Sequence, residues 1–111
     1  MERAIADNDD VAIAAVTAAE LLVGVELADP EHRDARSAFV EDVLQTLTVE
    51  DYTLATARAH AQLLAASRSA GSPRGAHDLI IAATAAASGR VVVTIDERGF
   101  QGLPGVDVRL V

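Results

Sequence analysis

The sequence predicts an α/β three-layer sandwich, in which a short, mostly parallel sheet is covered by helices on both faces. Short apolar runs that suit buried strands alternate along the chain with longer segments of helical spacing. Such alternation is typical of a parallel sheet with helical crossovers. The clearest strand, over residues 91–95, is apolar along nearly its whole length, as expected for a strand that is buried on both faces.

In the first half of the chain, turn and capping residues set the expected element boundaries. The apolar run 11–16 predicts a strand. One helix is expected to start at Thr17, because its spacing from Glu20 fits a capping box, and another at Asp29, which Pro30 follows. The remaining expectations here are the end of a helix over residues 1–7, a turn at residues 8–10 and a short strand over residues 46–49.

The second half of the chain is expected to hold two more helices and two more strands. A long helix is expected to start at Thr53, and an alanine-rich helix over residues 77–88 is expected to end at Gly89. The strand over residues 91–95 and a last short strand over residues 106–110 follow. The apolar stripe expected on the long helix consists of Leu54, Ala57, Ala61 and Leu64.

Composition bounds the class of protein. A length of 111 residues predicts one domain, here over residues 1–111. The absence of cysteine excludes disulfides, zinc–thiolate sites and cysteine nucleophiles. No apolar run is long enough to span a bilayer, and the N-terminus does not resemble a secretory signal. We therefore expect a cytoplasmic protein that does not associate with a membrane. The net charge of −8 argues against a simple basic clamp on nucleic acid, whereas a bound cation would supply the local positive charge.

Three acidic residues, Glu20, Asp78 and Asp96, are the candidate catalytic and metal-binding residues. Each also has an ordinary structural explanation: a capping box for Glu20, a favourable helix-dipole position for Asp78 and a turn for Asp96. Their joint placement is more informative. In a parallel sheet, the carboxyl ends of strands and the starts of helices share one edge, so all three are expected to face one crevice.

Carboxylates that converge in one crevice repel one another, so at least one is expected to take up a proton unless a cation binds. At an effective dielectric constant of about 20, each close pair repels by on the order of 3–4 kcal/mol. Oxygen ligands without histidine or cysteine suit hard ions. The acids therefore predict a Mg²⁺ (or Mn²⁺) ion that orients and deprotonates a water and stabilises charge on an attacked phosphate.

Three short motifs surround these acids and resemble one known family. They are Thr17-Ala-Ala-Glu20-Leu21 followed by Gly24, Asp78-Leu-Ile-Ile-Ala-Ala with Arg74 and His77 just before it, and Thr94-Ile-Asp96 followed by Phe100. They are similar to the second, third and fourth acid motifs of PIN-domain nucleases, and the nearest subgroup is the VapC-type toxins of bacterial toxin–antitoxin modules. The resemblance covers about residues 10–111. It implies a PIN-like sandwich and a Mg²⁺-dependent endoribonuclease that cleaves an RNA substrate, is neutralised by a small VapB-type antitoxin and forms a homodimer.

The start of the chain departs from the family pattern. PIN domains begin with a central strand that carries the first catalytic aspartate, and the run 11–16 corresponds to the family's second strand. Asp7, Asp9 and Asp10 precede that run, so they are expected at the opposite edge of the sheet. We therefore expect an N-terminally truncated domain that lacks the first β–α unit. A misassigned start at Met1, a decayed gene or folding by association would each explain this.

Four further residues are weaker candidates for substrate binding. Arg74 and Arg98 flank the acids and are candidates for holding RNA phosphates, against a role as solvated surface arginines. His77 is a candidate for contacting substrate or water, and Thr94 for bonding a metal-bound water or a carboxylate; both residue types are also ordinary at a helix start and in a strand.

Two other functions compete with a ribonuclease toxin. The first is a catalytically inactive, truncated PIN remnant that binds an antitoxin or a full-length toxin. The second is a small signalling domain with an acidic pocket, of the response-regulator type. Such domains depend on a lysine in that pocket, and this chain has none, which makes the second alternative the weaker.

Overall fold

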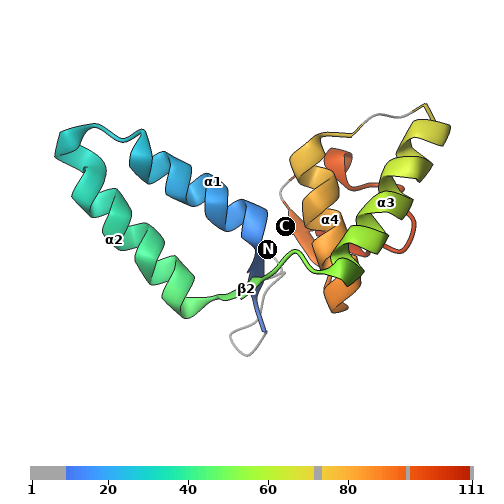
Figure 1. Cartoon of the computed structure of the whole chain (residues 1–111), viewed down its shortest axis with the longest axis horizontal. Helices are drawn as coiled ribbons and strands as arrows, with labels where there is room; N and C mark the ends of the chain where they lie inside the picture. The colour runs from blue at the N-terminus through green and yellow to red at the C-terminus, as the bar shows by residue number, and fades with distance from the viewer. Residues whose placement is uncertain (1–9, 72–73, 95, 111) are drawn as a thin grey trace. The chain divides into compact units, whose positions relative to one another are not determined.

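The computed structural model describes residues 10–71, 74–94 and 96–110. Helices and short strands alternate along the chain (Figure 1), which confirms the predicted α/β class. The expectations for residues 1–9 and for Ile95 lie outside the described residues. The elements are β1 (Ala12–Ala14), α1 (Ala15–Glu26), α2 (Pro30–Thr46), β2 (Thr48–Glu50), α3 (Leu54–Ser69), α4 (Ala76–Ser88), β3 (Val92–Thr94), the 3₁₀ turn η1 (Glu97–Gly99) and β4 (Val108–Leu110).

The chain forms two compact units. The N-terminal unit is Asp10–Asp51, and the described part of the C-terminal unit lies within Tyr52–Val111. Each unit holds one two-stranded parallel sheet among its described residues, β1 with β2 and β3 with β4. The parallel pairing expected from the alternation of strands and helices is therefore confirmed, whereas the single domain over residues 1–111 stays a prediction.

In the N-terminal unit, the pair of helices α1 and α2 connects β1 to β2. The strands pair from Ala12 with Thr48 to Ala14 with Glu50. Figure 1 shows α1 and α2 running back along each other. Helix α2 begins as expected, with Asp29 as the N-cap residue and Pro30 in the first helical position, although the Asp29 side chain makes no capping hydrogen bond.

The expected start of α1 at Thr17 is wrong. The helix starts at Ala15, its N-cap residue is Ala14, and no side chain caps it. Alanine is the best helix former, so the helix extends upstream through Ala15 and shortens the strand before it. Thr17 and Glu20 therefore form no capping box at the helix start. The first turn of α1 contains no acidic residue, and Glu20 lies after it.

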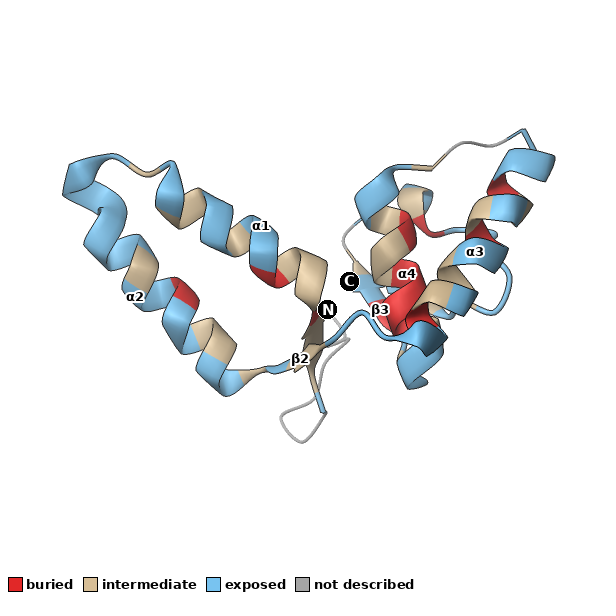
Figure 2. Cartoon of the chain, in the orientation of Figure 1, coloured by how far each residue is buried: buried red, intermediate tan, exposed pale blue. Residues whose placement is uncertain are grey.

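The core of the C-terminal unit lies between α3 and α4 (Figure 2). Ala82 and Ala83 on α4 have no exposed surface, and Leu63 on α3 and Leu79 on α4 are each 2% exposed. Alanine allows two helices to approach closely, because its side chain is a single methyl group. Phe100 and Leu103, from the segment after β3, close the same cluster.

The stripe expected on α3 is partly wrong. Leu54 is 69% exposed, and the buried residues of this helix are Thr56, Leu63 and Ser67. Alanine on every face of α3 left the spacing of its apolar residues ambiguous. The predicted start of the helix is confirmed, because Thr53 is its N-cap residue and exchanges capping hydrogen bonds with Thr56.

The chain leaves α4 as predicted and enters β3. Gly89 is the C-cap residue and has a φ of 69°, in the left-handed region that favours glycine. In β3, Val92 is buried while Val93 is 37% exposed, because successive side chains of a strand point to opposite faces. The strand is thus covered on one face only, unlike the expected strand buried on both. In the part of the chain that is described, no helix is long and apolar enough to cross a membrane.

Candidate active site

Asp78 lies in the first turn of α4, as predicted, and its side chain is partly buried. Gly75 is the N-cap residue of that helix. The carboxylate of Asp78 lies directly against the backbone of Gly99, the last residue of η1: a Cβ atom on Gly99 would overlap with Asp78 Oδ2 and lie 3.0 Å from Asp78 Cγ. The start of α4 and the turn after β3 therefore meet at this carboxylate.

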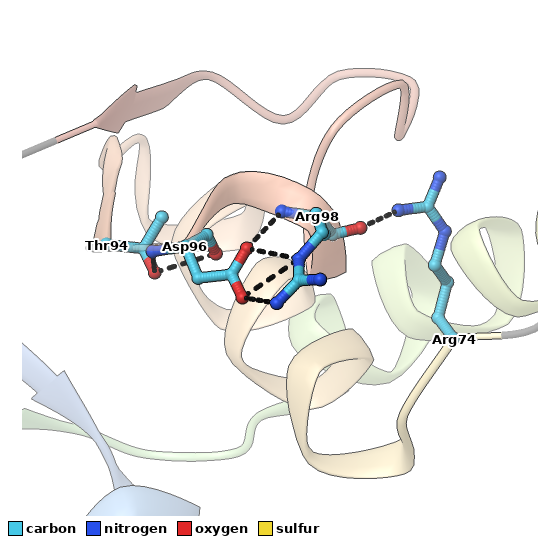
Figure 3. Close-up of polar contacts among 4 residues, drawn as sticks. All are labelled: Arg74, Thr94, Asp96 and Arg98. Carbon is cyan, nitrogen blue, oxygen red and sulfur yellow. Dashed lines mark hydrogen bonds and ion pairs between the residues drawn. The ribbon is translucent and has the colours of Figure 1, made fainter.

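Asp96 lies at the other end of the same turn. It follows β3 and is the N-cap residue of η1, where its Oδ1 accepts a hydrogen bond of 3.1 Å from the backbone N–H of Arg98. The guanidinium of Arg98 also binds the carboxylate through one edge, with Nε 2.9 Å from Oδ1 and Nη2 2.6 Å from Oδ2 (Figure 3). These hydrogen bonds from the Arg98 side chain, and next the one from its backbone, lower the pKa of Asp96 from 3.8 to about 2.

The ion pair predicts how the pKa of Asp96 responds to changes at Arg98. In Arg98→Gln the pKa of Asp96 should rise towards 3.8, and in Arg98→Lys it should rise less, because lysine keeps the charge but not the planar fork. A lowered pKa favours the ionised, folded state above pH 3.8, and this contribution is lost as the pH falls through about 2. Carboxyl ¹³C NMR titration measures the shift; an unchanged pKa in Arg98→Gln would contradict the assigned cause.

Thr94 fixes the backbone of Asp96. Its hydroxyl donates to the Asp96 carbonyl at 3.1 Å and accepts from the Asp96 N–H at 3.2 Å. The hydroxyl of Thr94 is therefore bonded to main-chain atoms of Asp96 and not to a carboxylate, which was one of its two expected roles. The effect is to hold Asp96 at the strand end from which η1 starts.

Arg74 and Arg98, the two expected phosphate-binding arginines, are both engaged within the protein. Arg74 donates from Nη1 to the Arg98 carbonyl at 2.8 Å (Figure 3) and from Nη2 to the Gln101 carbonyl at 2.6 Å. Arg98 holds Asp96. Binding of RNA phosphates by either residue stays a prediction. His77, in the first turn of α4, is exposed, and its predicted role is likewise untested.

Glu20 belongs to the N-terminal unit, whereas Asp78 and Asp96 belong to the C-terminal unit. Within residues 10–71, 74–94 and 96–110, no group of three or more acidic, histidine or cysteine side chains is gathered as a metal-binding cluster. The convergence of all three acids therefore stays a prediction. What the structure does bring together is Asp78 and Asp96, at the two ends of one turn.

The chemistry of this pair fits a hard divalent cation. The three residues of η1 rise only about 6 Å as a 3₁₀ turn, so two carboxylates border a short stretch of backbone. Both offer oxygen ligands alone, which suits Mg²⁺ or Mn²⁺. Asp96 already holds a cationic group. The residue that the sequence did not reveal is Gly99, which resembles any turn glycine until its contact with Asp78 is known.

Comparison with known proteins gives the class. Residues 1–105 match the PIN domain model, and the chain belongs to the PIN domain family. Its relatives are VapC proteins, which confirms the resemblance that the three acid motifs indicated. Over 107 residues it is 33% identical to the tRNA(fMet)-specific endonuclease VapC of Salmonella typhimurium, across 96% of this chain and 80% of that protein.

Solved structures give the same fold. A chain in the crystal structure of DNA-bound VapBC from Salmonella typhimurium is 33% identical, with a TM-score of 0.82 over 88% of this chain and 73% of that one. A chain in the structure of VapBC-5, a member of the VapBC family of toxin–antitoxin systems from Mycobacterium tuberculosis, is 32% identical, with a TM-score of 0.80 over 96% and 91%. The expected PIN-like α/β architecture is therefore confirmed.

Proposed function

We propose that this protein is an endoribonuclease toxin of a VapBC-type toxin–antitoxin module, and that its cleavage of RNA phosphodiester bonds depends on Mg²⁺ or Mn²⁺. The observation that carries the proposal is the placement of Asp78 and Asp96 at the two ends of η1. Membership of the PIN domain family and the endonuclease named among its relatives support it.

In this proposal, Asp78 and Asp96 would hold the metal ion, and Glu20 is the predicted third carboxylate. When bound, the ion lowers the pKa of a water and stabilises negative charge on phosphate oxygens. Thr94 and the capping bond from Arg98 fix Asp96 at the end of β3. Arg98 lies in η1, directly after its N-cap residue Asp96, and His77 precedes Asp78 in α4, which supports their proposed role in holding a substrate phosphate.

The proposed partners follow from the relatives. The similar structures are VapBC complexes, which supports a small VapB-type antitoxin as the protein partner. RNA is the proposed substrate, a homodimer the proposed assembly and the cytoplasm the proposed location. The net charge of −8 favours an antitoxin segment that carries basic residues, because opposite charges speed and orient association.

Removal of the metal tests the function. The purified full chain should cleave a mixed tRNA substrate in Mg²⁺ or Mn²⁺, lose all cleavage in excess EDTA, and regain it when Mn²⁺ is restored. Ca²⁺, which prefers more ligands and a looser geometry, serves as the matched ion control and should support little cleavage. Cleavage that persists in EDTA would reject the metal mechanism. Binding of a VapB-type antitoxin without any cleavage in Mn²⁺ would instead favour the inactive remnant.

A further inference from the structure

One side chain, that of Arg74, connects the segment after β3 to the start of α4 by two hydrogen bonds. Arg74 lies just before the helix, and its guanidinium donates to two carbonyls of the other segment, those of Arg98 and Gln101. Those carbonyls lie on either side of Gly99 and Phe100, so the bonds span the end of η1. Arg74 is partly buried, and a planar fork with donors in fixed directions suits two acceptors better than an ammonium does.

The residue of η1 that lies against Asp78 is Gly99, which has no side chain. An added Cβ on Gly99 would overlap with Asp78 Oδ2 and would stand 3.6 Å from Asp78 Cβ. Gly99 has no positive φ, so the turn does not need glycine for its backbone conformation. The three atoms nearest to the added Cβ all belong to Asp78, so the requirement for glycine at this position is steric.

Gly75 lies against the same carboxylate but leaves more room. An added Cβ there would stand 3.6 Å from Asp78 Oδ2, which is an ordinary van der Waals separation. The backbone of Gly75 is extended, with a φ of −61°, and any L-residue adopts that conformation. Two glycines thus contact one carboxylate, but only Gly99 is sterically required.

We infer that Arg74 and Gly99 are positioning residues for Asp78: Arg74 holds η1 against the start of α4, and Gly99 leaves the space that the Asp78 carboxylate occupies. The inference rests on the proposed function in taking that carboxylate as a metal ligand. It assigns Arg74 a role within the protein, whereas an arginine that only bound RNA phosphates would have no effect on metal binding in the absence of RNA.

A methyl group at Gly99 should displace the carboxylate without unfolding the unit. The atoms that it meets are the end of the Asp78 side chain, which can rotate about its own bonds. The carboxylate then leaves the position that the fold gives it, and the metal loses a ligand or binds one in poor geometry. Loss of a partner that orients a ligand typically weakens metal binding 10–100-fold.

The test is titration of the full chain with Mn²⁺ alone, without RNA, followed by electron paramagnetic resonance. Gly99→Ala and Arg74→Ala should each bind Mn²⁺ about 10–100-fold more weakly than the wild type. Gly75→Ala is the matched control: it adds the same methyl group beside the same carboxylate and should leave the affinity within about twofold, since 3.6 Å is ordinary contact. Arg74→Lys should fall between wild type and Arg74→Ala.

Wild-type affinity in Gly99→Ala and Arg74→Ala would overturn the inference and leave the proposed function intact. A wild type that binds no Mn²⁺ would reject the proposed function instead. A second measurement needs no metal: in a ¹H–¹⁵N spectrum, Asp78→Asn should shift the amide signal of Gly99, and Arg74→Ala should shift it too. An unmoved Gly99 signal in both variants would overturn the positioning contact itself.

Discussion

Replacing Asp78 with asparagine is expected to reduce kcat/KM for RNA cleavage at least about 100-fold, beyond the 10–100-fold typical of residues that only support a ligand. Asparagine has nearly the same shape, so it fits beside Gly99, but it carries no negative charge for a divalent cation. The fold should persist, because α4 packs into the core through other residues, which include Leu79, Ala82 and Ala83. Single-turnover cleavage of a labelled tRNA, with far-ultraviolet circular dichroism on the same sample, measures both effects.

Asp107→Asn is the matched control for this prediction. It makes the same chemical change in the same unit, at an exposed residue. The main-chain carbonyl of Asp107, which the substitution keeps, accepts a hydrogen bond from the Val92 N–H. Its cleavage rate should stay within about twofold of wild type, as is usual for a surface substitution. Full activity in Asp78→Asn would remove this residue from the active site and, with it, the proposed metal site.

The largest effect on stability is expected for Leu63→Ala, which should lower the free energy of unfolding by about 2–5 kcal/mol. Leu63 is 2% exposed and belongs to the cluster between α3 and α4. Its truncation leaves a cavity in a cluster that includes Ala82 and Ala83, whose side chains are too short to fill it. Because small domains are stable by only about 5–15 kcal/mol, urea denaturation should show a clearly lower midpoint.

Leu54→Ala makes the same substitution on the same helix and separates packing from helix propensity. Leu54 is 69% exposed, so its truncation should change the free energy of unfolding by no more than about 0.5 kcal/mol. Equal losses in the two variants would mean that α3 does not pack against α4 through the face that contains Leu63.

Local chemistry made parts of this fold predictable. Asp29, Thr53 and Gly89 stand at helix ends where the sequence placed them, because capping depends on a few neighbouring residues. The start of α1 was missed, since the alanines on both sides of that boundary favour helix as far upstream as Ala15. The buried face of α3 was misplaced for the same reason, because alanine marks no face.

The candidate site was predictable to a similar depth. The positions of Asp78 in a first turn and Asp96 after a strand followed from motif and spacing, and the structure confirms both. The contact of Asp78 with Gly99 joins residues far apart in the sequence, so no local pattern contains it. The bonds of Arg74 to two main-chain carbonyls could not be predicted either, because every residue has a carbonyl and the sequence does not show which one accepts.

Under the proposed function, the ion pair between Asp96 and Arg98 would make binding of a metal ion at this carboxylate an exchange. Both oxygens of Asp96 already accept hydrogen bonds from the Arg98 guanidinium, so a divalent ion bound there would take the place of one positive group. The measured affinity for the ion would then be the difference between the attraction of Asp96 to the ion and its attraction to Arg98. Added salt screens exposed charges and would weaken both attractions. Under the proposed function, that exchange would leave the planar fork of Arg98 donors beside the acids, where it could hold a substrate phosphate.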